Sequence, residues 1–133
     1  MLFLFHAHSG LRYLVLLAAV LAILYLAFGW LTRRPFDAPA RILTASFTGL
    51  LDLQVVFGIL LLFFRPFYPA LTGHVMMMVF AAIAAHGLGV AGKKQTDPHK
   101  RYGITLAGVV LALALIVGGI LAIRQGVFQT SLS

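Results

Sequence analysis

The sequence contains no cysteine and few charged side chains, and these shortages exclude several classes of protein. Without cysteine the chain can form no disulfide, no thiolate metal site and no iron–sulfur cluster of its own. Only 10% of the 133 residues are charged and 62% are hydrophobic, which is not the composition of an ordinary soluble domain. Hydrolytic catalysis finds no support either, because no phosphate-binding loop, metalloprotease motif or nucleophile–base set is present.

Four apolar runs dominate what is present, at residues 11–31, 42–64, 71–91 and 103–123. Each reaches the roughly 20 residues that an α-helix needs to cross the hydrocarbon core of a bilayer. The loops between the runs are short, so neighbouring spans should run antiparallel. We therefore expect one all-α transmembrane domain over residues 1–133, built as an up-down-up-down four-helix bundle.

Basic residues outnumber acidic ones by ten to three, and their positions predict the orientation of the bundle. Most of them lie in or beside the first and third loops: Arg33, Arg34, Arg41, Lys93, Lys94, Lys100 and Arg101. The positive-inside rule places these loops in the cytoplasm and both termini on the outer, periplasmic side. The excess of basic residues thus indicates how the protein is oriented in the membrane rather than nucleic-acid binding. The N-terminus lacks the positive region of a secretory signal, so we expect the first span to be retained.

The third apolar run carries two histidines, His74 and His86. An ionisable side chain within a membrane span is costly and by default indicates a functional site. Twelve residues separate the two, which corresponds to roughly 18 Å along a helix and about 120° around it. We therefore expect the two histidines to have different partners.

His74 has an expected partner in the first span. Ser9 is a candidate N-cap for that helix, which would place His8 at its outer mouth. The first and third spans run in the same direction, so His8 (or His6) and His74 share one depth. Two histidines on different helices at equal depth can be the axial ligands of a b-type haem. The alternative interpretation is that both form hydrogen bonds at the membrane interface.

Arg12 follows His8 by four residues and shares its helical face. Facing inward, it would hold an anionic group such as a porphyrin carboxylate. Facing outward, it would extend toward the lipid headgroups, as arginine near a helix end commonly does. The sequence leaves both orientations open.

A copper site is a further alternative at the outer face. Imidazole and thioether groups are suitable copper ligands. The candidates are His6, His8, His74, Met76, Met77 and Met78. Methionine also fills apolar gaps well, and the spacing does not match a defined copper motif.

Asp52 lies near the middle of the second span, the most costly depth for a carboxylate. His86 should lie at a similar depth, so the two can pair if spans two and three meet through these faces. A quinol pocket lined by Asp52, Gln54 and His86 would exchange protons through the histidine, which titrates near neutral pH. A structural hydrogen bond between helices is the alternative.

Several stretches together resemble a family of small four-span bacterial membrane proteins described as cytochrome b-like. The resemblance implies a multi-pass subunit of a respiratory or photosynthetic electron-transfer complex in the bacterial inner membrane, with no catalytic residue of its own. It further implies haem b held by His8 and His74, with Arg12 beside it, and a quinone- or proton-handling group around Asp52, Gln54 and His86. The stretches are His8-Ser9-Gly10-Leu11-Arg12-Tyr13-Leu14-Val15-Leu16, Asp52-Leu53-Gln54-Val55-Val56-Phe57-Gly58, His74 with its methionines, Ala85-His86-Gly87-Leu88-Gly89 and Asp97-Pro98-His99-Lys100-Arg101.

The expected partners are the lipid bilayer and other membrane subunits, without nucleic acid. The competing hypothesis is an accessory subunit that carries no cofactor and only packs against a larger complex.

Overall fold

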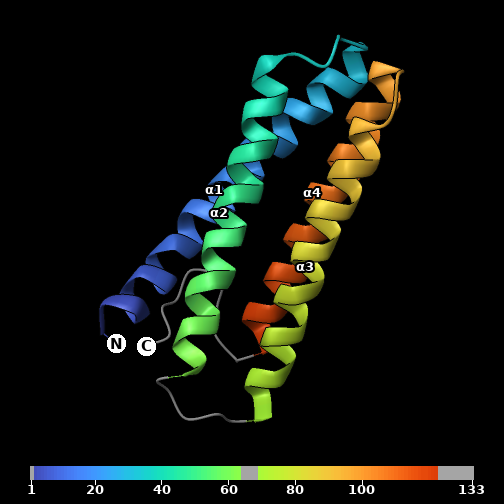
Figure 1. Ribbon diagram of the computed structural model, residues 1–133. Helices are drawn as coiled ribbons and strands as arrows, with labels where there is room; N and C mark the ends of the chain where they lie inside the picture. The colour runs from blue at the N-terminus through green and yellow to red at the C-terminus, as the bar shows by residue number, and fades with distance from the viewer. Residues whose placement is uncertain (1, 64–68, 123–133) are drawn as a thin grey trace.

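A computed structural model describes residues 2–63 and 69–122 and contains four long α-helices in this part of the chain (Figure 1). The helices are α1 (Leu2–Thr32), α2 (Ala38–Leu62), α3 (Pro69–Lys93) and α4 (Pro98–Ala122). Within the described residues, four segments are long and apolar enough to cross a membrane: His6–Thr32, Ala38–Leu62, Gly73–Lys93 and Pro98–Gly119. The protein is therefore all-α, and its four candidate spans indicate a multi-pass membrane protein.

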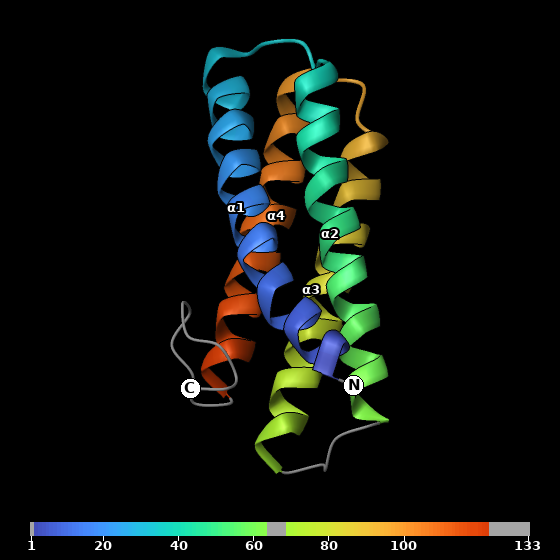
Figure 2. The same cartoon turned by 90° about the vertical axis from the view of Figure 1, so that its left-hand side faces the viewer.

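The helices form two closely associated pairs. α1 packs against α2 and α4, and α3 packs mainly against α4, whereas α2 and α3 touch only loosely. The α1–α2 loop and the α3–α4 loop lie together at one end of the molecule (Figures 1 and 2). We call this end, which carries residues 32–37 and 93–101, the basic end. The start of α1 and the start of α3 lie at the opposite end.

α1 begins much earlier than the apolar run predicted. It is helical from Leu2, so Ser9 is buried within the helix and the prediction that it caps the N-terminus is wrong. The reason is that no proline or glycine interrupts residues 2–9, and a helix continues wherever nothing stops it. His8 is consequently held by a continuous helix rather than by a loop.

Aspartates define the starts of two other helices. Asp37 caps α2, because its Oδ1 accepts a hydrogen bond from the Ala40 amide at 3.1 Å. Asp97 accepts from the His99 amide at 3.0 Å, and Pro98 occupies the first position of α4. α4 therefore starts at Pro98 rather than at 103. The expected outer loop at residues 65–69 lies largely outside the described residues, as does the end of the expected fourth span.

The interior of the bundle is built largely from small side chains. Fully buried positions include Ala19 and Ala22 of α1, Ala81 of α3 and Ala112 of α4. Lipid is as apolar as these side chains, so close packing of small residues, not exclusion of water, holds membrane helices together. Glycine brings α3 and α4 especially close, since a Cβ on Gly108 would lie 2.8 Å from the Leu88 Cβ.

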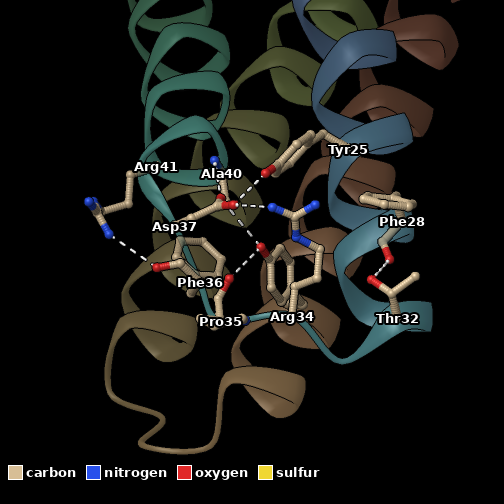
Figure 3. Close-up of polar contacts among 10 residues, drawn as sticks. Tyr25, Phe28, Thr32, Arg34, Pro35, Phe36, Asp37, Ala40 and Arg41 are labelled. Carbon is tan, nitrogen blue, oxygen red and sulfur yellow. Dashed lines mark hydrogen bonds and ion pairs between the residues drawn. The ribbon is translucent and has the colours of Figure 1, made fainter.

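A polar cluster fastens the basic end. Asp37 accepts hydrogen bonds from the Tyr25 hydroxyl and, at 3.2 Å, from the Arg34 guanidinium (Figure 3). The buried Tyr102 hydroxyl donates to the Pro35 carbonyl at 2.9 Å and lies 3.5 Å from Asp37 Oδ1. The hydrogen bond from Tyr25, followed by the amide at the cap and by Arg34, lowers the pKa of Asp37 below its ordinary value. This cluster ties α1, α2 and α4 to one carboxylate.

The ring of Tyr102 fits against α1 only because residue 29 is glycine. A Cβ on Gly29 would lie 2.3 Å from Tyr102 Cε1, well inside contact distance. The close approach of α1 and α4 at the basic end thus depends on this one missing side chain.

Candidate functional site

The imidazoles of His8 and His74 meet inside the bundle near the start of α1. Their ring centres lie 6.5 Å apart with an interplanar angle of 89°. Metal–imidazole bonds are about 2 Å long, so two imidazoles that share one metal ion have ring centres roughly 6 Å apart. The structure therefore brings together the two histidines that the sequence paired, with a separation of ring centres close to that value and ring planes nearly perpendicular.

His74 is held in a defined orientation by α4. Its Nδ1 lies 2.9 Å from the Gly119 carbonyl oxygen. A carbonyl can only accept, so Nδ1 carries the proton and donates, which leaves Nε2 with a free lone pair. Metal-binding histidines are commonly oriented in this way, by a hydrogen bond from the nitrogen that does not bind the metal.

Glycines face both imidazoles. A Cβ on Gly58 of α2 would lie 3.2 Å from His8 Cε1, and a Cβ on Gly119 would lie 3.5 Å from His74 Nδ1. Neither glycine adopts a positive φ, so the reason for glycine here is space and not backbone conformation. The absence of side chains at these positions leaves room for the rings themselves.

Arg12 lies in the same region and is buried, with 7% of its surface exposed. Its guanidinium donates to the Tyr13 hydroxyl at 3.0 Å, while its Nε has no hydrogen-bond partner. The inward orientation is thus the one the structure adopts. A buried guanidinium without a compensating anion is costly.

No carboxylate side chain of this protein remains to neutralise Arg12. The sequence has only three acidic residues. Asp37 is engaged by Tyr25 and Arg34, Asp52 by His86, and Asp97 by the backbone of α4. An anion from outside the chain would compensate the charge, and a carboxylate-bearing cofactor is one source.

Gln54 belongs to this interior region, which sequence reasoning missed. It is 5% exposed, its Oε1 has no hydrogen-bond partner, and its backbone is a hydrogen-bond partner of the His8 ring. The predicted grouping of Gln54 with Asp52 and His86 is wrong, because two residues along a helix correspond to about 200° of rotation. The two-residue spacing of Asp52 and Gln54 in the sequence already indicates that their side chains lie on different sides of the helix.

Asp52 and His86 do form a pair, on the outer surface of the bundle. His86 Nε2 lies 2.8 Å from Oδ1 and 2.9 Å from Oδ2 of Asp52, across the loosely packed α2–α3 seam. Both side chains are about half exposed, at 46% for Asp52 and 55% for His86. The sequence predicted the pair but not its outward position.

The copper ligands predicted as an alternative are not gathered at one place. His6 is exposed, whereas His8 is half-buried, because they lie about 200° apart on α1. Met78 is buried, while Met76 and Met77 are exposed on α3. In the described ranges, no three histidine, aspartate or glutamate side chains form a group that could hold a metal ion.

Comparisons with protein-family models, with curated proteins and with solved structures give no match. The interpretation of the site therefore depends on its geometry. That geometry consists of two imidazoles with ring centres 6.5 Å apart, a buried guanidinium, and buried polar atoms without hydrogen-bond partners on His8, Arg12 and Gln54.

Proposed function

We propose that this protein is a small membrane subunit of an electron-transfer complex that carries one b-type haem between His8 and His74. The observation that carries the proposal is the proximity of two imidazoles from different helices, with ring centres 6.5 Å apart and planes nearly perpendicular, and with His74 oriented by the Gly119 carbonyl. Two such histidines from different helices are a common way to hold haem in a helical bundle.

Each residue of the region has a distinct part in this proposal. His8 and His74 would hold the iron through ring nitrogens, and the Gly119 carbonyl keeps the His74 ring in place. Arg12 would bind a haem carboxylate, which would neutralise its buried charge. When bound, haem supplies a centre that gains and loses one electron reversibly. The chain contributes no catalytic side chain of its own.

The placement in the membrane follows from the distribution of charge. Seven of the ten basic residues lie at or beside the basic end, which supports a cytoplasmic position for that end in an up-down-up-down bundle. His8 and His74 then lie near the outer face of a bacterial inner membrane. Almost all of the described chain is helix long and apolar enough to cross a membrane. In this proposal electrons therefore enter and leave through other subunits.

The test is a visible absorption spectrum of the purified protein. We expect a Soret band and a pyridine haemochrome in the wild type, and loss of both in His8→Ala and His74→Ala. His86→Ala and His99→Ala are matched controls, because each removes a histidine far from the interior pair; both should keep the spectrum.

Two other results would replace the proposal. A wild-type protein without haem, purified with its complex intact, would favour an accessory subunit that only packs against larger partners. Stoichiometric copper in the same preparation, lost in His74→Ala, would favour the copper site instead. Retention of the full spectrum in both histidine variants would refute the assignment of the ligands.

A further inference from the structure

The basic end carries positive charge that the chain itself does not neutralise. Seven basic residues lie at or beside this end, together with two aspartates, Asp37 and Asp97. Arg34 is ion-paired with Asp37 at 3.2 Å, and Arg41 donates to a backbone carbonyl. The other five, which we call the unpaired cations, form no ion pair within the residues that the structure describes: Arg33, Lys93, Lys94, Lys100 and Arg101.

Helix packing brings four of the unpaired cations together. The end of α3 touches the start of α4, since a Cβ on Gly92 would lie 3.5 Å from the Arg101 carbonyl oxygen. Lys93 and Lys94 directly follow Gly92 in the sequence, and Lys100 directly precedes Arg101. Two pairs of cations therefore lie where two helix ends meet (Figure 1). Like charges this close repel one another, and an anion bound between them would relieve the repulsion.

Trp30 of α1 indicates the depth of this cluster in the membrane. Its indole lies flat against the imidazole of His99, with ring centres 5.5 Å apart and an interplanar angle of 11°. Trp30 is 38% exposed, and tryptophan is enriched where the hydrocarbon core meets the lipid headgroups. The candidate spans His6–Thr32 and Gly73–Lys93 also end at this level. The unpaired cations therefore lie at the depth of the lipid phosphates.

Arg101 is held in place by aromatic packing. Its guanidinium carbon lies 4.0 Å from the centre of the Phe36 ring, and its Nε is buried without a hydrogen-bond partner. A guanidinium fixed in this way loses little conformational freedom on binding, and its planar fork matches the oxygens of a phosphate. Arg101 is thus the best-prepared anion ligand among the unpaired cations.

Arg33 occupies a backbone position that favours glycine. It follows the last residue of α1 with a φ of 55°, in the left-handed region where helices commonly end on glycine. The Arg34 amide donates to the Gly29 carbonyl at 3.2 Å and closes the helix end. A side chain with a Cβ is strained in this conformation, and strained residues concentrate at functional sites. The strain at Arg33 is a second indication, independent of charge, that a side chain at this end has a use.

We propose that the unpaired cations form a binding site for the phosphate of an anionic phospholipid in the leaflet that the basic end faces. Lys93 and Lys94 approach the phosphate from α3, and Lys100 and Arg101 approach it from α4. The acyl chains then extend along the apolar spans of the same helices. Basic clusters directly beside the ends of membrane helices are suited to such headgroups. The site is at the opposite end of the bundle from His8 and His74, so it does not depend on the proposed haem.

An acidic segment of another subunit is the competing occupant. The unpaired cations lie in or directly after the last turn of a span or in the first turn of one, so a bilayer by itself surrounds them with phosphates. A protein carboxylate would have to be brought to the same depth and desolvated there, which offsets most of its attraction. The position of the cations therefore favours the lipid.

The experiment uses Trp30, the only tryptophan of the chain, as the reporter. The full chain is placed in phosphatidylcholine nanodiscs, and its fluorescence is quenched by phospholipids with brominated acyl chains. Brominated phosphatidylglycerol should quench at lower mole fraction than brominated phosphatidylcholine, with a preference of roughly tenfold. Arg101→Gln should reduce this preference roughly fivefold, the effect of one basic side chain near a membrane surface. Lys100→Gln with Arg101→Gln should abolish it.

Three variants control for charge and for folding. Arg124→Gln makes the same change in net charge at a residue that follows α4 in the sequence, and the preference should not change. Asp97→Asn keeps a good cap on α4 but removes a negative charge beside the cluster, so the preference should rise. Arg33→Gly relieves the strained backbone and should therefore fold, yet it should still lower the preference.

Three results would overturn this inference. The first is equal quenching of the wild type by the two brominated lipids, or a preference that survives in the folded Lys100→Gln, Arg101→Gln protein. The second is complete loss of the preference on adding inorganic phosphate at constant ionic strength, which would assign the site to the free ion. The third is a photocrosslinker at Lys100, in native membranes, that captures a protein subunit in stoichiometric yield.

Discussion

The Asp37 cluster at the basic end and the His8–His74 region near the start of α1 differ in how many of their polar atoms form hydrogen bonds. Both oxygens of Asp37 accept hydrogen bonds, and the Tyr102 hydroxyl donates to Pro35. In the other region, His8 Nδ1, Arg12 Nε and Gln54 Oε1 are buried without partners. One cluster is complete within the chain, and the other is not.

This difference separates groups that hold the fold from groups that bind. A buried polar atom without a partner costs about 1–3 kcal/mol, so three of them at one place is an expensive arrangement for a protein that has no use for it. The Asp37 cluster carries no such cost and ties three helices together, although His99 Nδ1 and Arg101 Nε, elsewhere at the basic end, are also buried without partners. We therefore assign the Asp37 cluster to stability, and the proposed function assigns the His8–His74 region to cofactor binding.

The largest expected effect comes from removing the buried charge with Arg12→Met. The empty protein should become more stable by about 1–4 kcal/mol, as seen when buried charged groups are replaced by apolar ones of similar volume. Haem retention should fall in the same variant, because the carboxylate loses its partner. Thermal unfolding of the cofactor-free protein and haem content per chain measure the two effects.

Arg41→Met is the control, since Arg41 is exposed at the basic end and its bond to the Phe36 carbonyl is a surface contact. It should change neither quantity appreciably. A cofactor-free Arg12→Met protein that unfolds more easily than the wild type would contradict the interpretation of Arg12 as an uncompensated charge.

Gly29→Ala should disturb the complete cluster by displacing Tyr102. The new methyl group would overlap the ring, which hydrogen bonds hold at its hydroxyl, so it cannot easily move aside. We expect a loss of about 1–3 kcal/mol, the usual cost of overpacking. Gly118→Ala serves as the comparison because a Cβ there meets nothing within 4 Å. Equal unfolding temperatures for the two variants would show that the contact of Gly29 with Tyr102 is not tight.

A smaller effect should appear as the pH falls. The pKa of Asp37 is lowered in the folded protein, so the stabilisation from its ionised form is complete above the ordinary value of about 3.9. It is lost as the pH falls through the lower folded value. Asp37→Asn keeps a good cap and removes the ionisation, so its unfolding temperature should vary less with pH over this range. Parallel profiles for wild type and variant would show that Asp37 does not contribute.

The sequence predicted the features that depend on composition and helical spacing. The four long apolar helices are confirmed as candidates to cross a membrane, because hydropathy over some twenty residues is a strong signal. The proximity of His8 to His74 and of Asp52 to His86 is also found in the structure. Each pair was predicted because ionisable side chains are rare in apolar spans and because its two members were expected at similar depths in the membrane.

Features that depend on which side of a helix faces inward were predicted less well. Gln54 was grouped with its neighbour in the sequence although a helix turns the two apart. The outward position of Asp52 and His86 depends on the loose contact between α2 and α3, which no local pattern reveals. The roles of Gly29 and Gly58 could not be predicted from the sequence, because the sequence does not show which aromatic or imidazole ring packs against a glycine.

The buried guanidinium of Arg12 has a consequence for the life of the protein in the cell. Any ligand that binds only the folded state raises its stability in proportion to the logarithm of its concentration over its dissociation constant. A chain that has received an anionic cofactor is therefore more resistant to unfolding than one that has not. If the proposed cofactor is bound, membrane proteases, which act on opened chains, would remove unfilled copies first, and cofactor supply would set how much of this protein accumulates.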